Sequence, residues 1–310
     1  MLKYISKRIF LVLFVLLGVT IITFCTMHFA PGDPEEVIAI ARYGEDLTQE
    51  QIEWVKVTEG FDAPIYAQYL KWLNHVLHLD LGQSLVTSEN VLKEITTRFP
   101  ATMILAFSSL IISLTIAIPA GIISAIKKNT IIGQFFMTGS LIGVSIPNFW
   151  LGLLLIWLFA LTLHLLPSYG YGGLSHLILP ALTLGTSMAA ITTRLTRSSM
   201  LDVLSQEYIV AAKAKGLDNR TIILKHALKN AMLPIITFAG MQLGFLLGGS
   251  VIVETIFAWP GIGKLLVDSI YARDFSMVQG CVLVIGVTFA LTNLAVDITY
   301  AFLDPRIRYE

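Results

Sequence analysis

The chain has 310 residues, of which 55% are apolar and 14% charged, against about 25% charged in a typical soluble domain. Its 21 basic and 21 acidic residues give a formal net charge of zero, which argues against a nucleic-acid partner. This composition excludes an ordinary soluble domain and indicates a polytopic protein in contact with membrane lipid.

Charge-free runs give the positions of the membrane-spanning helices. Each is at or beyond the ~20 residues that a helix needs to cross a ~30 Å hydrocarbon core. The runs cover residues 9–32, 99–126, 129–193, 230–253 and 275–296. The third is too long for one crossing and contains a turn-rich stretch at 166–173 that no continuous helix tolerates. The sequence therefore predicts an all-α polytopic membrane protein with six transmembrane helices.

Lysines and arginines near the ends of the spans predict the orientation. They gather before the first span, after the second, between residues 194 and 229, and at positions 306 and 308. All four groups fall on one side of a six-span arrangement, so both termini are expected to be cytoplasmic. The first span is expected to stay attached, because its apolar region exceeds the ~7–15 residues of a signal-peptide core.

These predictions divide the chain into successive parts. The parts are an N-terminal transmembrane helix (1–30), an extracytoplasmic segment with amphipathic helices (31–98), a core of five transmembrane helices (99–303) with a cytoplasmic loop (199–231), and a cytoplasmic tail (304–310).

Two helices are expected in the extracytoplasmic segment. Thr48, with Gln51 three residues later, has the pattern of a capping box and predicts a helix that ends near Glu59. A second helix is expected over 65–79, because its apolar residues recur at helical spacing. It is expected to lie on the membrane surface or on the helix bundle.

His75 and His78 lie three residues apart on the second exterior helix. They can share a face and are candidate contacts for a transition metal. A surface-exposed or packed histidine is the commoner interpretation.

The cytoplasmic loop has the pattern of a helical hairpin. Residues 205–215 contain few helix breakers, and Gly216 stands where a helix end requires a left-handed backbone. Asp218 can cap a second helix that continues from Arg220 to Lys229. The basic residues alone could be the positive-inside signal of two spans. An ordered helix pair is longer than that signal needs, which favours a rigid docking element.

The loop resembles the permease subunits of type I ABC importers, in particular their peptide/nickel branch. The matching residues are Glu207-Tyr208-Ile209, Ala211-Ala212 and Gly216. Val210 stands where the family usually has Glu, and Leu233-Pro234 comes about five residues late, as in the peptide/nickel branch. Further matches are Pro31-Gly32-Asp33-Pro34, Pro147-Asn148-Phe149-Trp150, Phe257-Ala258-Trp259-Pro260-Gly261 and Asp304-Pro305-Arg306-Ile307-Arg308.

The resemblance implies a six-helix permease fold and a role in coupling. The loop would insert into a groove on a separate ATPase subunit and carry its closing motion to the spans. The residues implied in this coupling are Glu207, Ala211, Ala212, Gly216, Asp218 and Arg220.

The resemblance also implies the partners and the location. A second homologous permease, identical or different, two ATP-binding cassette ATPases and an extracytoplasmic substrate-binding protein would complete the importer in a prokaryotic plasma membrane. The chain itself is expected to be no enzyme and to bind no cofactor. Gly261-Ile262-Gly263-Lys264 lacks the remaining residues of a P-loop, so ATP is expected to be used by the partner subunits.

Polar residues at span depth are candidates for the translocation path. Glu254 near the outer end of the fifth span is one, because exposing its charge to lipid is costly; a position at the membrane interface is the commoner interpretation. Asn148 and Gln242 are neutral candidates, for which a hydrogen bond between helices is the competing interpretation.

The substrate and the mode of transport leave alternatives. The short hairpin at 166–173 slightly favours nickel or a nickel chelate over di- or oligopeptides, by resemblance to nickel importers. A secondary transporter or channel that works alone is the alternative function. An intramembrane enzyme would need a buried nucleophile and base, or a metal set, that the sequence does not offer.

Overall fold

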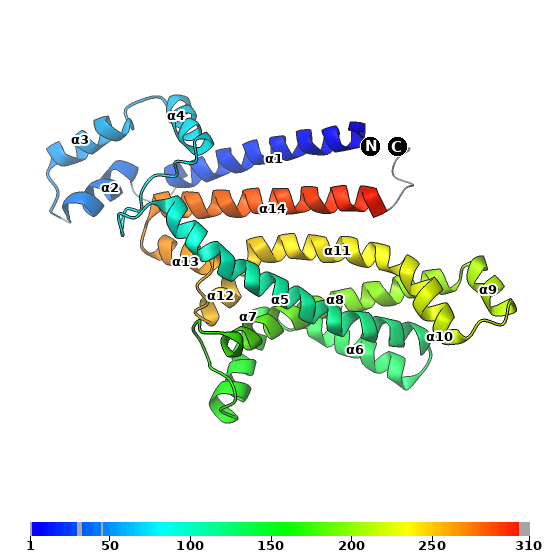
Figure 1. Cartoon of the computed structure of the whole chain (residues 1–310). Coiled ribbons are helices and arrows are strands. Elements are labelled where there is room, and N and C mark those ends of the chain that lie inside the picture. The colour runs from blue at the N-terminus through cyan, green and yellow to red at the C-terminus, as the bar shows by residue number, and fades with distance from the viewer. Residues whose placement is uncertain (1, 30–32, 45, 304–310) are drawn as a thin grey trace.

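The computed structural model describes residues 2–29, 33–44 and 46–303, and within these ranges it is a helical bundle without a β-strand (Figure 1). Five long helices are apolar enough to cross a membrane. These are α1 (Leu2–Phe29), α5 (Val91–Ile126), α8 (Leu174–Leu204), α11 (Leu228–Gly249) and α14 (Phe275–Leu303). They confirm five of the predicted spans. The Pro31-Gly32 part of one matching motif and the tail at 304–310 lie outside the described residues.

The predicted third span is not one straight helix. α6 (Ile131–Ser145) is followed by α7 (Asn148–Leu155) and a π-helical segment, η1 (Ile156–Thr162), and the two halves are bent by 102°. The break lies at Ile146, whose backbone is extended, and at Pro147, which precedes α7. Proline ends α6 here because it has no backbone N–H to continue the helix and because it disfavours a helical conformation in the residue before it. This bent pair stands where the sequence predicts the third span, and it counts as the sixth crossing if its two halves form one span.

The described residues between α1 and α5 form three helices. α2 (Pro34–Tyr43) was not predicted; α3 (Gln49–Glu59) begins with the predicted capping box, and α4 (Ile65–Leu77) ends close to the predicted boundary. α4 lies on the bundle: Tyr69 Oη is 2.9 Å from Thr20 Oγ1 of α1, and its ring contacts Phe24.

Close helix packing forms the centre of the bundle. α5 runs along α8, and a Cβ added at Gly185 would come within 2.9 Å of Ile112 of α5. The main buried cluster joins α5, α8 and α11 to the turn after α12 (Val251–Ile256), with Leu105, Leu179, Leu246, Phe257 and Trp259 at its centre. α13 (Ile262–Tyr271) then leads into α14.

The ends of the helices separate the two sides of the bundle (Figure 1). α2, α3 and α4 lie at one end. The beginning of α1, the end of α14, and the short helices α9 (Glu207–Ala214) and α10 (Asn219–Thr221) lie at the other. This arrangement agrees with an even number of crossings.

Candidate functional site

The hairpin between α8 and α11 has the turn geometry that the sequence predicts. Gly216 follows α9 with a left-handed φ of +76°. Asp218 caps α10, because its Oδ2 accepts a 3.0 Å hydrogen bond from Thr221 N–H. Bonds from the side chain and backbone of Thr221 hold the pKa of Asp218 below its ordinary value of 3.8. The carboxylate is therefore ionised at neutral pH, the favoured state at a helix N-terminus.

The inner face of α9 is packed on the bundle. Ile209 and Ala212 are buried in a cluster with Met200 of α8 and Ala125 of α5. Asn230 Nδ2 also donates a 2.7 Å hydrogen bond to Tyr208 Oη, which joins α9 to α11. Because interiors are close-packed, a force on this hairpin is transmitted to the helices beneath it.

The outer face of α9 exposes apolar side chains although it lies beyond the spans. Val210 is 61% exposed, Tyr208 41% and Leu217 39%. The implied coupling residues Glu207, Ala211, Gly216, Asp218 and Arg220 are exposed as well, whereas Ala212 is buried. Neighbouring exposed apolar side chains in a polar setting are typical of a protein contact surface. We call the exposed residues from Glu207 to Arg220 the outer face of the hairpin.

The second helix of the hairpin continues into the membrane. α10 runs through a π-helical segment, η2 (Ile222–Ala227), into α11, so that residues Asn219–Leu247 form one helical run of 29 residues. The sequence predicted the helix but not its π-helical turn. Such turns occur as single bulges inside α-helices, often at functional sites. The hairpin is thus the end of a spanning helix, and not a flexible linker between two spans.

Asn148 and Gln242, two of the three path candidates, border one cavity of about 320 Å³ between α7, α8 and α11. Its other walls are mostly apolar, among them Met188, Phe238 and Met241. A mostly apolar cavity with a few polar groups is the usual form of a small-molecule site. The structure therefore brings these two candidates together.

The two amides differ in what they bind. Gln242 is 8% exposed; its Oε1 accepts a 3.1 Å bond from Thr192 Oγ1, and its Nε2 donates a 3.4 Å bond to the Met188 carbonyl. It thereby joins α11 to α8, as the packing interpretation expects. Asn148 Oδ1 is buried and has no hydrogen-bond partner among the described residues. Such an atom in a cavity wall is available to a ligand.

Glu254 lies elsewhere, fully buried in α12. Its carboxylate accepts hydrogen bonds from Ser250 Oγ (2.6 Å), Thr102 Oγ1 (2.9 Å) and Lys264 N–H (3.0 Å). Thr102 Oγ1 in turn accepts the N–H of Ile262. Side chains from α12 and α5 thus bind the free N–H groups at the start of α13. Glu254 is not in the lining of the Asn148 cavity, and its path role stays a prediction.

The same carboxylate explains two glycines of the Trp259-Pro260-Gly261-Ile262-Gly263 motif. A Cβ at Gly261 would overlap the Glu254 carboxyl group, and one at Gly263 would lie 2.7 Å from Val251 Cα. Trp259 Nε1 donates a 2.8 Å bond to the Ala101 carbonyl. Sequence reasoning missed Thr102 and Ser250; their hydroxyls inside apolar stretches were the available signal.

The two histidine candidates have local partners. His75 Nδ1 is 3.2 Å from Asp80 Oδ2, and His78 Nδ1 is 2.8 Å from the Asn74 carbonyl. Two hydrogen bonds lower the pKa of Asp80: the larger effect comes from the backbone N–H of Gly82 and the smaller from the His75 side chain. No group of three His, Cys, Asp or Glu residues able to hold a metal occurs in the described part of the chain.

Comparisons with known proteins cover the length of the chain and agree on its family. Residues 117–309 match the family described as binding-protein-dependent transport system inner membrane component, and residues 1–106 match the N-terminal family of the same system. The glutathione transport system permease proteins GsiC of Escherichia coli K12 and of Salmonella typhimurium LT2 are each 41% identical over 310 residues, with 100% of both chains covered.

Solved structures agree on the fold. An inward-facing structure of the MetNI methionine ABC transporter superposes with a TM-score of 0.57 at 22% identity, covering 68% of this chain and 96% of that one. A second crystal form gives a TM-score of 0.58 at 20% identity.

Proposed function

Because the chain belongs to the family of binding-protein-dependent transport system inner membrane components, we propose that it forms part of the translocation path of an ATP-driven importer for short peptides. It is a multi-pass inner-membrane permease of an ABC importer, with the helical fold of that class. Its relatives are transport permeases and not enzymes.

The hairpin is the proposed contact with the ATPase. The observation that carries this proposal is the outer face of the hairpin, exposed and partly apolar, on a helix that continues into a spanning segment. Closure of the ATPase subunits would press on residues 205–230 and move α8 and α11 together, since α9 packs on both. The chain binds no cofactor in this scheme, and ATP is used by the partners.

The proposed complex has a second homologous permease, two ATPases and an extracytoplasmic binding protein. The hairpin end of the bundle faces the cytoplasm, as the distribution of basic residues indicates. The opposite end, with α2, α3, α4 and α13, then receives substrate from the binding protein.

For the substrate we favour a short peptide over nickel. The relatives matched along their full length are named for glutathione, itself a small peptide. The cavity offers the Asn148 Oδ1 atom, which has no partner among the described residues and can accept a hydrogen bond from a peptide N–H. The short hairpin between the third and fourth spans had favoured nickel, and the relatives favour the peptide alternative instead.

Two measurements test this function. A photoreactive residue at position 210 or 217 is expected to crosslink to the ATPase in the purified complex; products confined to lipid would contradict the docking. A competition experiment identifies the substrate: unlabelled dipeptides or Ni²⁺ compete with labelled glutathione, first for the binding protein and then for uptake. Competition by Ni²⁺ alone would refute the peptide proposal.

A further inference from the structure

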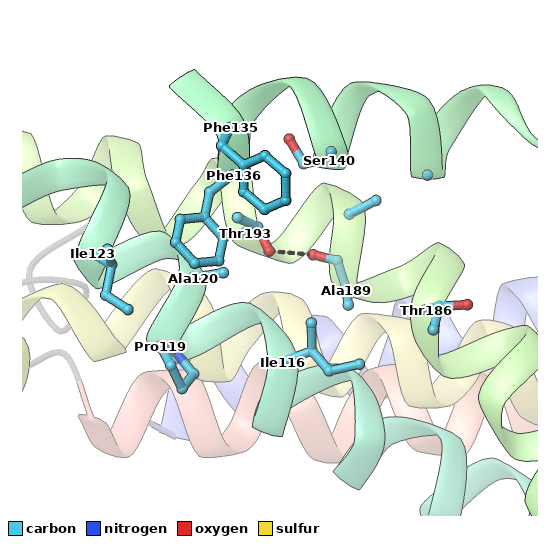
Figure 2. A pocket seen from close by; sticks show the side chains of 13 residues that line it. Ile116, Pro119, Ala120, Ile123, Phe135, Phe136, Ser140, Thr186, Ala189 and Thr193 are labelled. Atoms are coloured by element: carbon cyan, nitrogen blue, oxygen red, sulfur yellow. Dashed lines mark hydrogen bonds between the residues drawn. The ribbon is translucent and has the colours of Figure 1, made fainter. Parts of the chain in front are cut away.

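A groove of about 330 Å³ lies between α5, α6 and α8, away from the Asn148 cavity (Figure 2). Phe135 and Phe136 of α6 lie beside Thr193 of α8 at the same end of the groove as Ile123 of α5. The lining is almost entirely apolar. α5 and α8 are long and apolar enough to cross a membrane, and α6 belongs to the bent pair that can form a sixth span, so the groove lies at membrane depth.

On α5, the row of residues that line the groove leads to a basic residue at the end of the helix. The lining residues of this helix are Ile116, Pro119, Ala120 and Ile123, which share one face because a helix turns about 100° per residue. The next position of that row is Lys127, at the end of α5, and it is exposed.

The wall on α8 repeats this spacing. Its lining residues are Thr186, Ala189, Ala190 and Thr193, and the next position of the row is Arg197. The Nε of Arg197 is buried without a hydrogen-bond partner, and no ion pair to Arg197 or Lys127 occurs in the described part of the chain. Two unpaired cations therefore stand at one end of an apolar groove.

The hydroxyl groups in the groove have partners within their own helices. Thr193 Oγ1 donates to the Ala189 carbonyl at 2.7 Å, and Ser140 Oγ to the Met137 carbonyl at 2.8 Å. Their donors are thus already used, and the walls present hydrocarbon. An alkyl chain fits such walls better than a polar solute does.

We propose that this groove binds one anionic phospholipid, with an acyl chain between α5, α6 and α8 and its phosphate between Lys127 and Arg197. Charge complementarity selects an anionic head group, because basic residues at the membrane surface attract anionic lipid. In the orientation proposed above, the lipid belongs to the cytoplasmic leaflet. Ala125, in the last turn of α5, and Met200, one turn after Arg197 in α8, pack against the hairpin, so the lipid would lie directly beside the coupling element.

Native mass spectrometry of the whole importer, with phosphatidylglycerol or phosphatidylcholine supplied, tests the head group. Arg197→Gln and Lys127→Gln are each expected to lower phosphatidylglycerol retention about fivefold and to leave phosphatidylcholine unchanged. Lys128→Gln is the matched control, because it removes the same charge about 100° away from the row. Equal retention in all three variants would overturn the proposal. Arg197 Nε has no partner to lose, so the melting temperature should stay the same.

Filling the groove tests the acyl chain independently of charge. Gly139 borders the groove, and a Cβ there would meet nothing within 4 Å, so Gly139→Leu adds a side chain without displacing a neighbour's backbone. Crosslinking of a phosphatidylglycerol with a photoreactive acyl chain to residues 131–145 should be lost in this variant. Persistent crosslinking, or crosslinks from α6 to the second permease in place of lipid, would contradict the proposal.

Discussion

The carboxylate of Glu254 is buried among neutral donors. Among the described residues no cation pairs with it, since the Lys264 ammonium pairs with Asp268 while the Lys264 backbone N–H binds Glu254. Its role is to hold α12, α5 and the start of α13 in one arrangement. The sequence predicted an interfacial or path residue here. It could not predict this structural role, because Thr102, which binds Glu254, lies 152 positions away in the chain.

Replacement of Glu254 should therefore damage stability. Glu254→Ala removes the acceptor of three hydrogen bonds and is expected to cost about 3 kcal/mol of unfolding free energy, because buried donors lose their partner. Glu254→Gln keeps the shape and should cost less. The midpoint of thermal unfolding in detergent measures both. Glu53→Ala, at an exposed position of α3, is the control and should leave the midpoint unchanged.

Asn148 should separate substrate contact from stability. Because Asn148 Oδ1 has no partner, Asn148→Leu is expected to leave the unfolding midpoint unchanged and to lower peptide uptake about tenfold, as for a lost hydrogen bond to substrate. Met241→Leu, on another wall of the same cavity, is the control. Unchanged uptake in Asn148→Leu, at equal protein levels, would remove Asn148 from the path.

At the scale of elements, helix type and order could be predicted, but helix ends and bends could not. α5 begins at Val91 instead of residue 99, because the Asn90 side chain caps its start by accepting the Lys93 N–H and the i, i+4 pair of Glu94 with Arg98 supports helix beyond the charge-free run. The 102° bend at Pro147 could not be predicted from the presence of proline alone, because Pro100, Pro119 and Pro180 lie inside helices that continue past them.

The hairpin was predicted more completely because its signals are local. Gly216, Asp218 and the residues between them lie within one turn of the chain, so propensity and capping decide the structure. The packing of Ile209 and Ala212 on α5 and α8 is a long-range contact, and the residue pattern alone did not show it.

Gly216→Pro should uncouple ATP hydrolysis from transport. Proline cannot adopt the φ of +76° found there, so α9 would lose its position over α8. We expect the peptide imported per ATP to fall at least about tenfold, measured in proteoliposomes of the whole importer. Gly60→Pro, at the left-handed end of α3 and far from the hairpin in the chain, is the control for strain alone. Full coupling in Gly216→Pro would contradict the docking proposal.

The Asp218 cap should be pH-independent near neutrality. Its pKa is lowered in the folded protein, so the stabilisation is complete above the ordinary value of 3.8 and is lost as the pH falls below it. Asp218→Ala is expected to weaken coupling at every pH from about 6 to 8, and Asp218→Asn, which caps almost as well, to preserve it. The measurement is the amount of peptide imported per ATP across that pH range. An equal loss in Asp218→Asn and Asp218→Ala would contradict the role of Asp218 as a helix cap.

At the scale of the whole molecule, the chain is expected to need its partners for transport. Vesicles that contain this chain alone should show no peptide uptake above empty vesicles. Vesicles with both permeases, both ATPases and the binding protein should import peptide in proportion to the ATP hydrolysed. A complex whose ATPase lacks its P-loop lysine is the control and should be inactive. Uptake by the chain alone would instead support the secondary transporter or channel.

α1 packs along α14, with Arg8 2.9 Å from Asp297, and otherwise presents most of its surface outward. α1 thus has as its neighbour a helix that is translated only after all the helices between the two. At about 5–20 residues per second, the interval between them is on the order of ten to fifty seconds. During biogenesis α1 must therefore persist in the bilayer without α14 beside it, which its high mean hydropathy of 2.8 permits, and the α1–α14 pair forms only once α14 has been translated.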